Sequence, residues 1–276
     1  MVYFPKAQPS AVALERIEHS RASLTEGLKR FGRWLNRAYH AVDPALRRHL
    51  AEVPLLGGTL LASGKTPSLK LIDDRYRAVI FIHGFGGHRG NFIPMETYFR
   101  CLGRKRVLSL GFEDKSSMEV MAWELRRIVK TVLEENVFSM ERPIDIVAHS
   151  MGGILARVAL ETPEFAGKIN HLITLATPHS GTELARYLHT KKAQSLRPNS
   201  HLLNGLNRQL PWASNENFPT LTCFWTPQDM VLLPPESACV SGVKNIACPG
   251  CTHLGFLLKP QVWEAVYQQL SSDSIS

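Results

Sequence analysis

The chain has 276 residues, of which 44% are hydrophobic, and it carries a formal net charge of +8. This length suits one large domain with its own core. Residues 1–50 hold nine cations against four acidic residues, so this segment carries +5 of the excess and the remainder is near balance. The charge therefore argues against a nucleic-acid footprint over the main body.

The first 70 residues are predicted to form a basic helical extension and an irregular connector. Apolar residues recur at helical spacing along 11–50 with cations on the opposite face, and Pro44 marks a break before a second short helix. Two interpretations stay open for 11–50: a helix packed on the domain, or a helix in peripheral contact with an anionic membrane. The apolar stretch 53–70 either covers a pocket or joins two regions.

The start of the sequence lacks the apolar run and cleavage site of a signal peptide, and no segment is long and apolar enough to span a membrane. Five cysteines, an odd number in a chain of this size, indicate a reducing compartment. We expect a cytoplasmic protein, with peripheral membrane contact through residues 11–50 as the alternative.

From Arg77 onward, short apolar strands alternate with helices. The predicted strands are 78–82, 106–110, 144–149, 171–176, 221–225 and 244–247. The predicted helices are 91–102, 116–136, 154–161 and 261–270. This alternation predicts an α/β fold over residues 71–276, with a mostly parallel sheet covered by helices on both faces.

The junction after the third predicted strand is the most informative feature. The strand 144–149 runs into Ser150, and Gly152 and Gly153 follow before a helix begins. This is the layout of a nucleophile elbow, a strained turn that presents a serine hydroxyl above the sheet. The two glycines let the helix start against the strand. Ala148 stands where the pattern usually has its first glycine, and it is small enough for the turn to form.

A serine nucleophile needs a base, and the base needs an acid that orients it. After an elbow of this kind the acid comes next in the chain and the histidine last. Asp229 follows the apolar strand 221–225 and a turn, which places it at the carboxyl edge of the sheet; Glu236 is its rival. His253 comes late, follows the strand 244–247, and is the predicted base.

An oxyanion site needs two N–H donors. The first is the backbone N–H of Met151, the residue after the nucleophile. The second comes from the turn 83–87 after the first core strand, through the N–H of Phe85. Gly84 allows the backbone to come close, and His83 is expected to brace this turn.

Together these motifs resemble the α/β-hydrolase superfamily. The segments that carry the resemblance are Val-Ile-Phe-Ile-His-Gly-Phe-Gly-Gly (79–87), Asp-Ile-Val-Ala-His-Ser-Met-Gly-Gly (145–153), Thr-Leu-Ala-Thr-Pro-His-Ser-Gly-Thr (174–182) and those around Asp229 and His253. They are most similar to small bacterial triacylglycerol lipases and esterases of lipase class 2, with kinship to the GPI inositol-deacylase-like group. The resemblance covers roughly residues 77–270. It implies the triad Ser150, Asp229 and His253, with Phe85 and Met151 as oxyanion donors.

A cap segment is predicted over about 182–218, because this connection is too long for a bare loop. Its apolar face comprises Leu184, Leu188, Leu202, Leu203, Leu206 and Leu210. One or two cap helices either line the site, which favours a greasy substrate, or pack on the sheet as ordinary helices.

The resulting hypothesis is a serine carboxylic-ester hydrolase of lipase or esterase type, acting on an apolar small-molecule or lipid ester without cofactor or metal. An acyltransferase or a thioesterase would use the same groups, and a catalytically silent interaction protein is the alternative from another class. Cys248 and Cys251 have redox-like spacing. They lie just before His253 without a second ligand pair, so a redox or metal role is disfavoured.

Overall fold

The computed structural model describes residues 43–44, 47–48, 51–55, 76–112, 117–134, 143–160, 162–208 and 218–271. The chain divides into two compact units, Met1–Arg47 and Arg48–Ser276. The predicted helix over 11–50 and the connector over 53–70 lie mostly outside the described residues, so both stay predictions. Within the described part of the chain, no helix combines the length and the hydropathy needed to cross a membrane.

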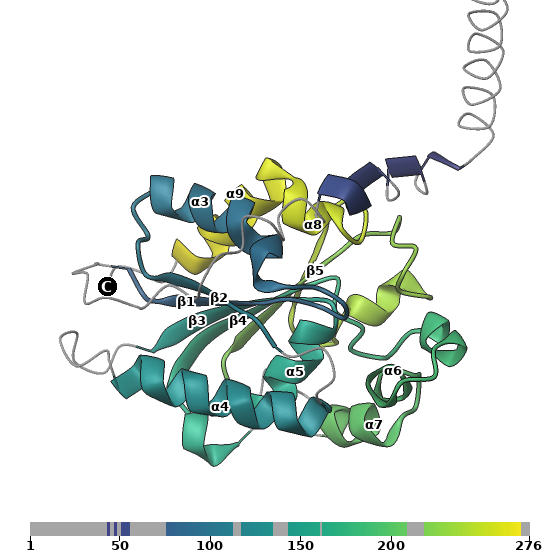
Figure 1. Ribbon diagram of the computed structural model, residues 1–276, viewed down its shortest axis with the longest axis horizontal. Coiled ribbons are helices and arrows are strands. Elements are labelled where there is room, and N and C mark those ends of the chain that lie inside the picture. Colours follow the sequence, from purple (N-terminus) through teal and green to yellow (C-terminus); the bar gives the residue numbers. More distant parts are fainter. Residues whose placement is uncertain are drawn as a thin grey trace, which may run out of the picture. The chain divides into compact units, whose positions relative to one another are not determined.

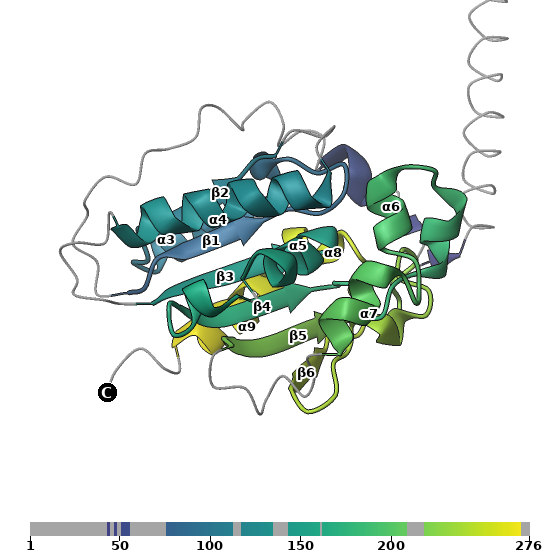
Figure 2. The ribbon, with the colours of Figure 1, turned by 90° about the horizontal axis from the view of Figure 1, so that it is seen from below.

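The second unit is built on one six-stranded sheet. Its strands are β1 (Val79–Ile82), β2 (Val107–Leu110), β3 (Ile144–His149), β4 (Ile169–Leu175), β5 (Thr220–Trp225) and β6 (Lys244–Ala247). Their order is β2-β1-β3-β4-β5-β6, and every neighbouring pair is parallel (Figure 2). The predicted parallel α/β sheet is confirmed.

Helices cover both faces of this sheet. The α-helices are α3 (Ile93–Cys101), α4 (Met118–Glu134), α5 (Met151–Leu160), α6 (Lys191–Ser195), α7 (His201–Asn207), α8 (Gly255–Leu258) and α9 (Pro260–Ser271). Short 3-10 helices are η1 (Arg89–Phe92), η2 (Pro163–Phe165), η3 (Glu183–Tyr187) and η5 (Pro235–Ala238). Figure 1 shows α3, α8 and α9 on one face and α4 and α5 on the other.

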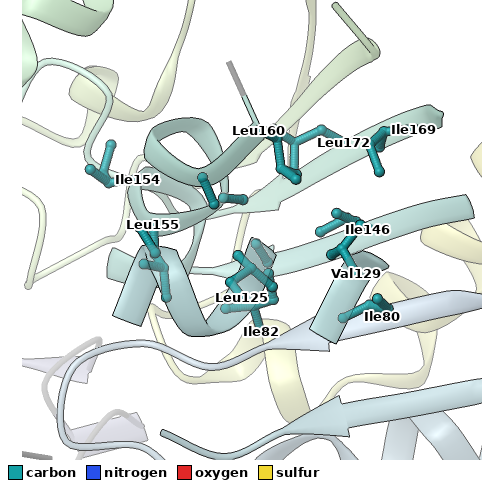
Figure 3. Close-up of a cluster of buried hydrophobic side chains, with 14 of the residues drawn as sticks. Ile80, Ile82, Leu125, Val129, Ile146, Ile154, Leu155, Leu160, Ile169 and Leu172 are labelled. Carbon is teal, nitrogen blue, oxygen red and sulfur yellow. The ribbon is translucent and has the colours of Figure 1, made fainter. Parts of the chain in front are cut away.

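The period-two alternation of strand side chains divides the core into two layers. Ile80, Ile82 and Ile146 point into a cluster with the buried face of α4 and with α5 (Figure 3). Phe81 and Val147 point the opposite way, into a cluster with α3, α8 and α9. Because both faces are covered, the central strands are apolar along their whole length.

The observed elements differ from the sequence prediction mainly at one boundary. Helix α5 begins at Met151, three residues before the predicted start at Ile154. The glycines at 152 and 153 are poor helix formers, which hid the first turn of the helix in the sequence pattern. The cap segment contains η3, α6 and α7, so its predicted helices are present.

A fully buried ion pair ties the start of β3 to the C-terminal helix. Arg104 Nη1 lies 3.2 Å from Asp145 Oδ2, and its Nη2 donates to the Leu270 carbonyl at 2.6 Å. The guanidinium also stacks 5.6 Å from the ring centroid of Tyr267. Burial raises the pKa of Asp145 and the charge of Arg104 opposes that rise, so each charge depends on the other.

Replacing Arg104 with Met should lower the free energy of unfolding by about 3–5 kcal/mol, because it leaves the Asp145 carboxylate buried without its cation. Urea unfolding followed by circular dichroism measures this change.

The matched control is Lys130→Met. Lys130 pairs with Glu164 at the surface, where both side chains are more than 40% exposed, so its loss should cost less than about 1 kcal/mol. If both variants lost the same free energy of unfolding, the buried pair would contribute no more to stability than the surface pair, which would contradict the prediction.

Candidate active site

Ser150 alone forms the turn between β3 and α5. Its φ is +54°, a left-handed conformation that costs a non-glycine residue on the order of 1 kcal/mol. Three hydrogen bonds hold it there: its N–H donates to the Leu175 carbonyl at 2.9 Å, and its carbonyl accepts from Thr177 Oγ1 at 2.9 Å and from the Gly153 N–H at 3.0 Å. The serine therefore occupies the strained turn of the predicted elbow.

Three close backbone approaches make this turn possible. A Cβ on Gly152 would lie 2.6 Å from the carbonyl oxygens of Ile82 and His83, and one on Gly153 would overlap the Thr177 side chain. A Cβ on Gly84 would lie 2.8 Å from the Cβ of Ser150. The first core loop, Ser150 and the start of α5 are thus packed together in a way that only glycine permits. Ala148 is buried in β3, one residue before this crowded region.

The structure brings Ser150, His253 and Asp229 into one hydrogen-bonded line. His253 Nε2 lies 3.0 Å from Ser150 Oγ, and His253 Nδ1 lies 2.8 Å from Asp229 Oδ2. The other Asp229 oxygen, Oδ1, accepts the backbone N–H groups of Val231 and Leu232 at 2.8 and 2.9 Å. The three groups follow β3, β5 and β6, whose carboxyl ends share one edge of the sheet. The rival acid Glu236 is exposed.

The electrostatics suit an ionised acid beside an imidazole. Burial acts to raise the pKa of Asp229. The charge of His253, its hydrogen bond and the two backbone donors outweigh burial and hold that pKa below its ordinary value. Asp229 is therefore a carboxylate at neutral pH, and as an acceptor it takes the proton on His253 Nδ1. His253 Nε2 is then the nitrogen that faces the Ser150 hydroxyl.

His149 supports His253 from the other side. Its Nε2 lies 2.9 Å from the His253 carbonyl oxygen, and the two rings are 4.8 Å apart. A carbonyl only accepts, so this nitrogen carries the proton. Burial and the proximity of His253 lower the pKa of His149 to about 3. His149 is thus a neutral donor that fixes the main chain of the base.

The loop after β1 lies against the nucleophile. His83 Nδ1 is 2.9 Å from the Gly84 carbonyl oxygen, which gives His83 the contact that a bracing role requires. Met151 is the first residue of α5, and the first N–H groups of a helix have no intrahelical acceptor. The Phe85 ring is partly exposed, with Lys192 Nζ of the cap 5.4 Å from its centroid.

A pocket of about 500 Å³ opens beside Ser150 and His253. Most of its lining is apolar and comes from four loops and the cap: Phe85, Pro178, Leu184, Ala185, Leu188, Ala193, Leu196, Val231, Leu232 and Leu254. Side chains of the cap face two different parts of the structure. Leu184 and Leu188 face the pocket, whereas Leu203 and Leu206 are buried in the core cluster and Leu202 packs against it. Each of the two alternatives for the cap therefore describes one part of it, and Leu210 lies outside the described residues.

Several supporting residues were missed by sequence reasoning. Thr177 holds the Ser150 carbonyl, and Gln228 Oε1 accepts the Gly250 N–H at 2.8 Å, which ties the acid loop to the base loop. Both residues lie inside motifs that were already informative, one in 174–182 and one directly before Asp229. Their contacts join residues far apart in the sequence, so spacing alone could not reveal them.

Comparison with known proteins supports the same architecture. A family model described as a PGAP1-like alpha/beta domain matches residues 116–197. Lipase B of Aspergillus fumigatus superposes with a TM-score of 0.58 and 18% identity, covering 71% of this chain and 52% of that one. The mature lipase BlEst2 of Bacillus licheniformis gives a TM-score of 0.61 and 15% identity over 74% of this chain and 95% of that one. A gene product of Listeria innocua gives a TM-score of 0.52 and 14% identity over 70% of this chain and 92% of that one.

The chain has the α/β-hydrolase fold. The resemblance that the motifs carry is thereby confirmed at the level of fold. In an α/β-hydrolase the residue at the strand-to-helix elbow stands above the carboxyl edge of the sheet, and Ser150 occupies this place. The chain spans about half the length of the Aspergillus lipase.

All five cysteines are free thiols. Burial raises the pKa of Cys248, and it raises that of Cys251 to about 12. Both therefore remain protonated at neutral pH, which disfavours nucleophilic or redox chemistry. Among the described residues, no three His, Cys, Asp or Glu side chains lie close enough together to hold a metal ion.

Replacing Gly153 with Ala should destabilise the protein by about 1–3 kcal/mol, because the new methyl group overlaps Thr177 and forces apart α5 and the loop that holds Ser150. Denaturant unfolding gives the change in stability.

Gly205→Ala provides the control. Gly205 lies in α7, and a Cβ there would meet nothing within 4 Å. This variant should gain about 0.5–1 kcal/mol from helix propensity. A stabilising effect of Gly153→Ala would contradict the close contact between Gly153 and the Thr177 side chain.

Proposed function

We propose that the protein is a serine hydrolase that cleaves carboxylic esters with an apolar acyl group. The observation that carries the proposal is the line from Ser150 Oγ through the His253 ring to the buried Asp229 carboxylate, with separations of 3.0 and 2.8 Å. These are hydrogen-bond distances that a nucleophile, its base and an orienting acid require. Two of the structural neighbours are lipases, which supports an ester as the substrate.

In the first half of the reaction, Ser150 Oγ attacks the ester carbonyl carbon while its proton passes to His253 Nε2. Asp229 holds the imidazole and stabilises the cation that forms. The carbonyl oxygen becomes an oxyanion, which accepts the N–H groups of Met151 and Phe85. His253 then gives the proton to the leaving alcohol oxygen as the carbon–oxygen bond breaks, which leaves an acyl group on Ser150.

In the second half, water replaces the alcohol. His253 Nε2 takes a proton from water as its oxygen attacks the acyl carbon. The tetrahedral intermediate collapses, the carboxylic acid leaves, and the proton returns to Ser150 Oγ. The neutral state of His149 matters here, since a second cation beside His253 would oppose the imidazolium.

Replacing Ser150 with Ala should lower the turnover of a p-nitrophenyl ester by roughly 10⁴-fold or more, because the acyl-enzyme can no longer form. A spectrophotometric assay with p-nitrophenyl butyrate measures this loss.

A fluorophosphonate probe provides the independent readout. It should label the wild type and leave Ser150→Ala unlabelled. A wild type that neither reacts with the probe nor cleaves esters would overturn the proposal and favour a silent interaction protein. Product analysis with an added alcohol or thiol separates hydrolysis from acyl transfer, which uses the same residues.

The apolar lining predicts a preference for longer acyl chains. Each methylene group removed from water contributes up to about 0.8 kcal/mol. We therefore expect kcat/KM for p-nitrophenyl octanoate to exceed that for the acetate by roughly tenfold or more. A chain-length series at fixed pH measures this ratio, and a strict preference for acetate would contradict an acyl-binding role for Leu184 and Leu188.

A further inference from the structure

A short helical turn that precedes the core contacts the loop carrying His253. Residues 51–55 are helical and belong to the same compact unit as the sheet. Glu52 Oε2 accepts a hydrogen bond from the Thr252 hydroxyl, and Arg48 Nη1 donates to the Gly250 carbonyl at 3.4 Å. Glu52 of this turn and Arg48, which precedes it, thus contact the chain just before His253.

Thr252 connects this contact to both sides of His253. Its side chain is buried, and its Oγ1 accepts the Gly255 N–H at 3.0 Å while donating to Glu52. A Cβ on Gly255 would lie 3.1 Å from Glu52 Oε1, so the carboxylate sits against the turn that follows the base. Thr252, directly before His253, and Gly255, two residues after it, therefore both lie against one carboxylate.

The base loop needs such support more than the other two loops. The nucleophile follows β3, in which every residue is buried. The base follows β6, the last strand in the sheet order, whose four residues are exposed or only half-buried. Because β6 has a neighbouring strand on one side only, the loop that carries His253 is held by contacts from outside the sheet.

The next residue of the same turn reaches the pocket. Val53 lines the cavity beside Ser150 and His253, together with Leu254. Leu55, two residues further on, is 62% exposed and does not line it. One helical turn thus presents a carboxylate to the base loop and an apolar side chain to the substrate cavity.

We propose that Glu52 is a positioning residue for His253 and that Val53 is a specificity-determining residue of the acyl pocket. This inference rests on the proposed ester hydrolysis and adds to it a site component that precedes the core sequence. Glu52 acts through Thr252 and touches no reacting atom. Its contribution is to keep His253 Nε2 within hydrogen-bonding distance of Ser150.

The first test compares Glu52→Ala with Glu52→Gln. Alanine removes the oxygen that accepts from Thr252, so kcat should fall by roughly 10- to 100-fold, which is the effect of a small misplacement of a catalytic group. The KM for a short ester should stay nearly unchanged. Glutamine keeps an oxygen that accepts from Thr252 and should retain kcat within about twofold of the wild type. The concentration of active sites is measured by fluorophosphonate labelling, and kcat is calculated per labelled site, so a loss of folded protein does not change the kcat obtained.

The second test uses Val53→Trp, with Leu55→Trp as the matched control. The indole at 53 should fill part of the cavity and lower the octanoate-to-acetate ratio of kcat/KM by roughly tenfold, the scale on which a hydrophobic pocket discriminates chain length. The same substitution at 55 should leave the ratio unchanged. This pair keeps the inference testable if Glu52→Ala does not fold.

Two results would overturn the inference. One is an unchanged kcat in Glu52→Ala, or an equal loss in Glu52→Gln, while the wild type cleaves esters. The other is an equal change of chain-length ratio in both tryptophan variants. If the wild type cleaves no ester, the proposed function fails separately. The positioning role is then decided by the NMR signals of the His253 ring, which Glu52→Ala must shift and Leu55→Trp must not.

Discussion

The left-handed turn at Ser150 is the constraint on which the rest of the site depends. A single residue connects a fully buried strand to a helix, so α5 must start within contact of the β1 loop and of the residues after β4. Gly152, Gly153 and Gly84 supply the missing Cβ atoms at these contacts. The packing that holds the serine in its strained conformation also sets the first core loop against it, since a Cβ on Gly84 would lie 2.8 Å from the Ser150 Cβ.

Electrostatic roles in the site follow from where each group is buried. Asp229 is buried but accepts two backbone N–H groups and pairs with His253, which keeps it ionised. His149 is buried beside His253 with a carbonyl as its hydrogen-bond partner, which keeps it neutral. Two histidines whose rings are 4.8 Å apart therefore have different partners. His253 pairs with the Asp229 carboxylate, and His149 donates to the main chain of His253.

The sequence predicted those features that depend on local order. Ser150, Asp229 and His253 each follow an apolar strand, and parallel strands end at one edge, so their convergence could be expected. Contacts across long separations left no such pattern. The bond between Glu52 and Thr252 joins residues 200 positions apart. The sequence assigns the cap leucines at 184 and 203 to one apolar face, and only the folded chain shows that the first faces the pocket and the second the core.

The position of each strand in the sheet determines how the loop that follows it is held. Ser150 leaves the interior strand β3 and is fixed by hydrogen bonds from the neighbouring strand and its loop. His253 follows the edge strand β6, and its loop is held by cross-links from elsewhere: Gln228 to Gly250, His149 to the His253 carbonyl, and Glu52 to Thr252. Two of the three residues that supply these links, His149 and Glu52, either line the pocket themselves or precede a residue that does. In this arrangement the groups that stabilise the base also shape the space that the substrate enters, so changes in specificity and changes in the alignment of His253 should be coupled.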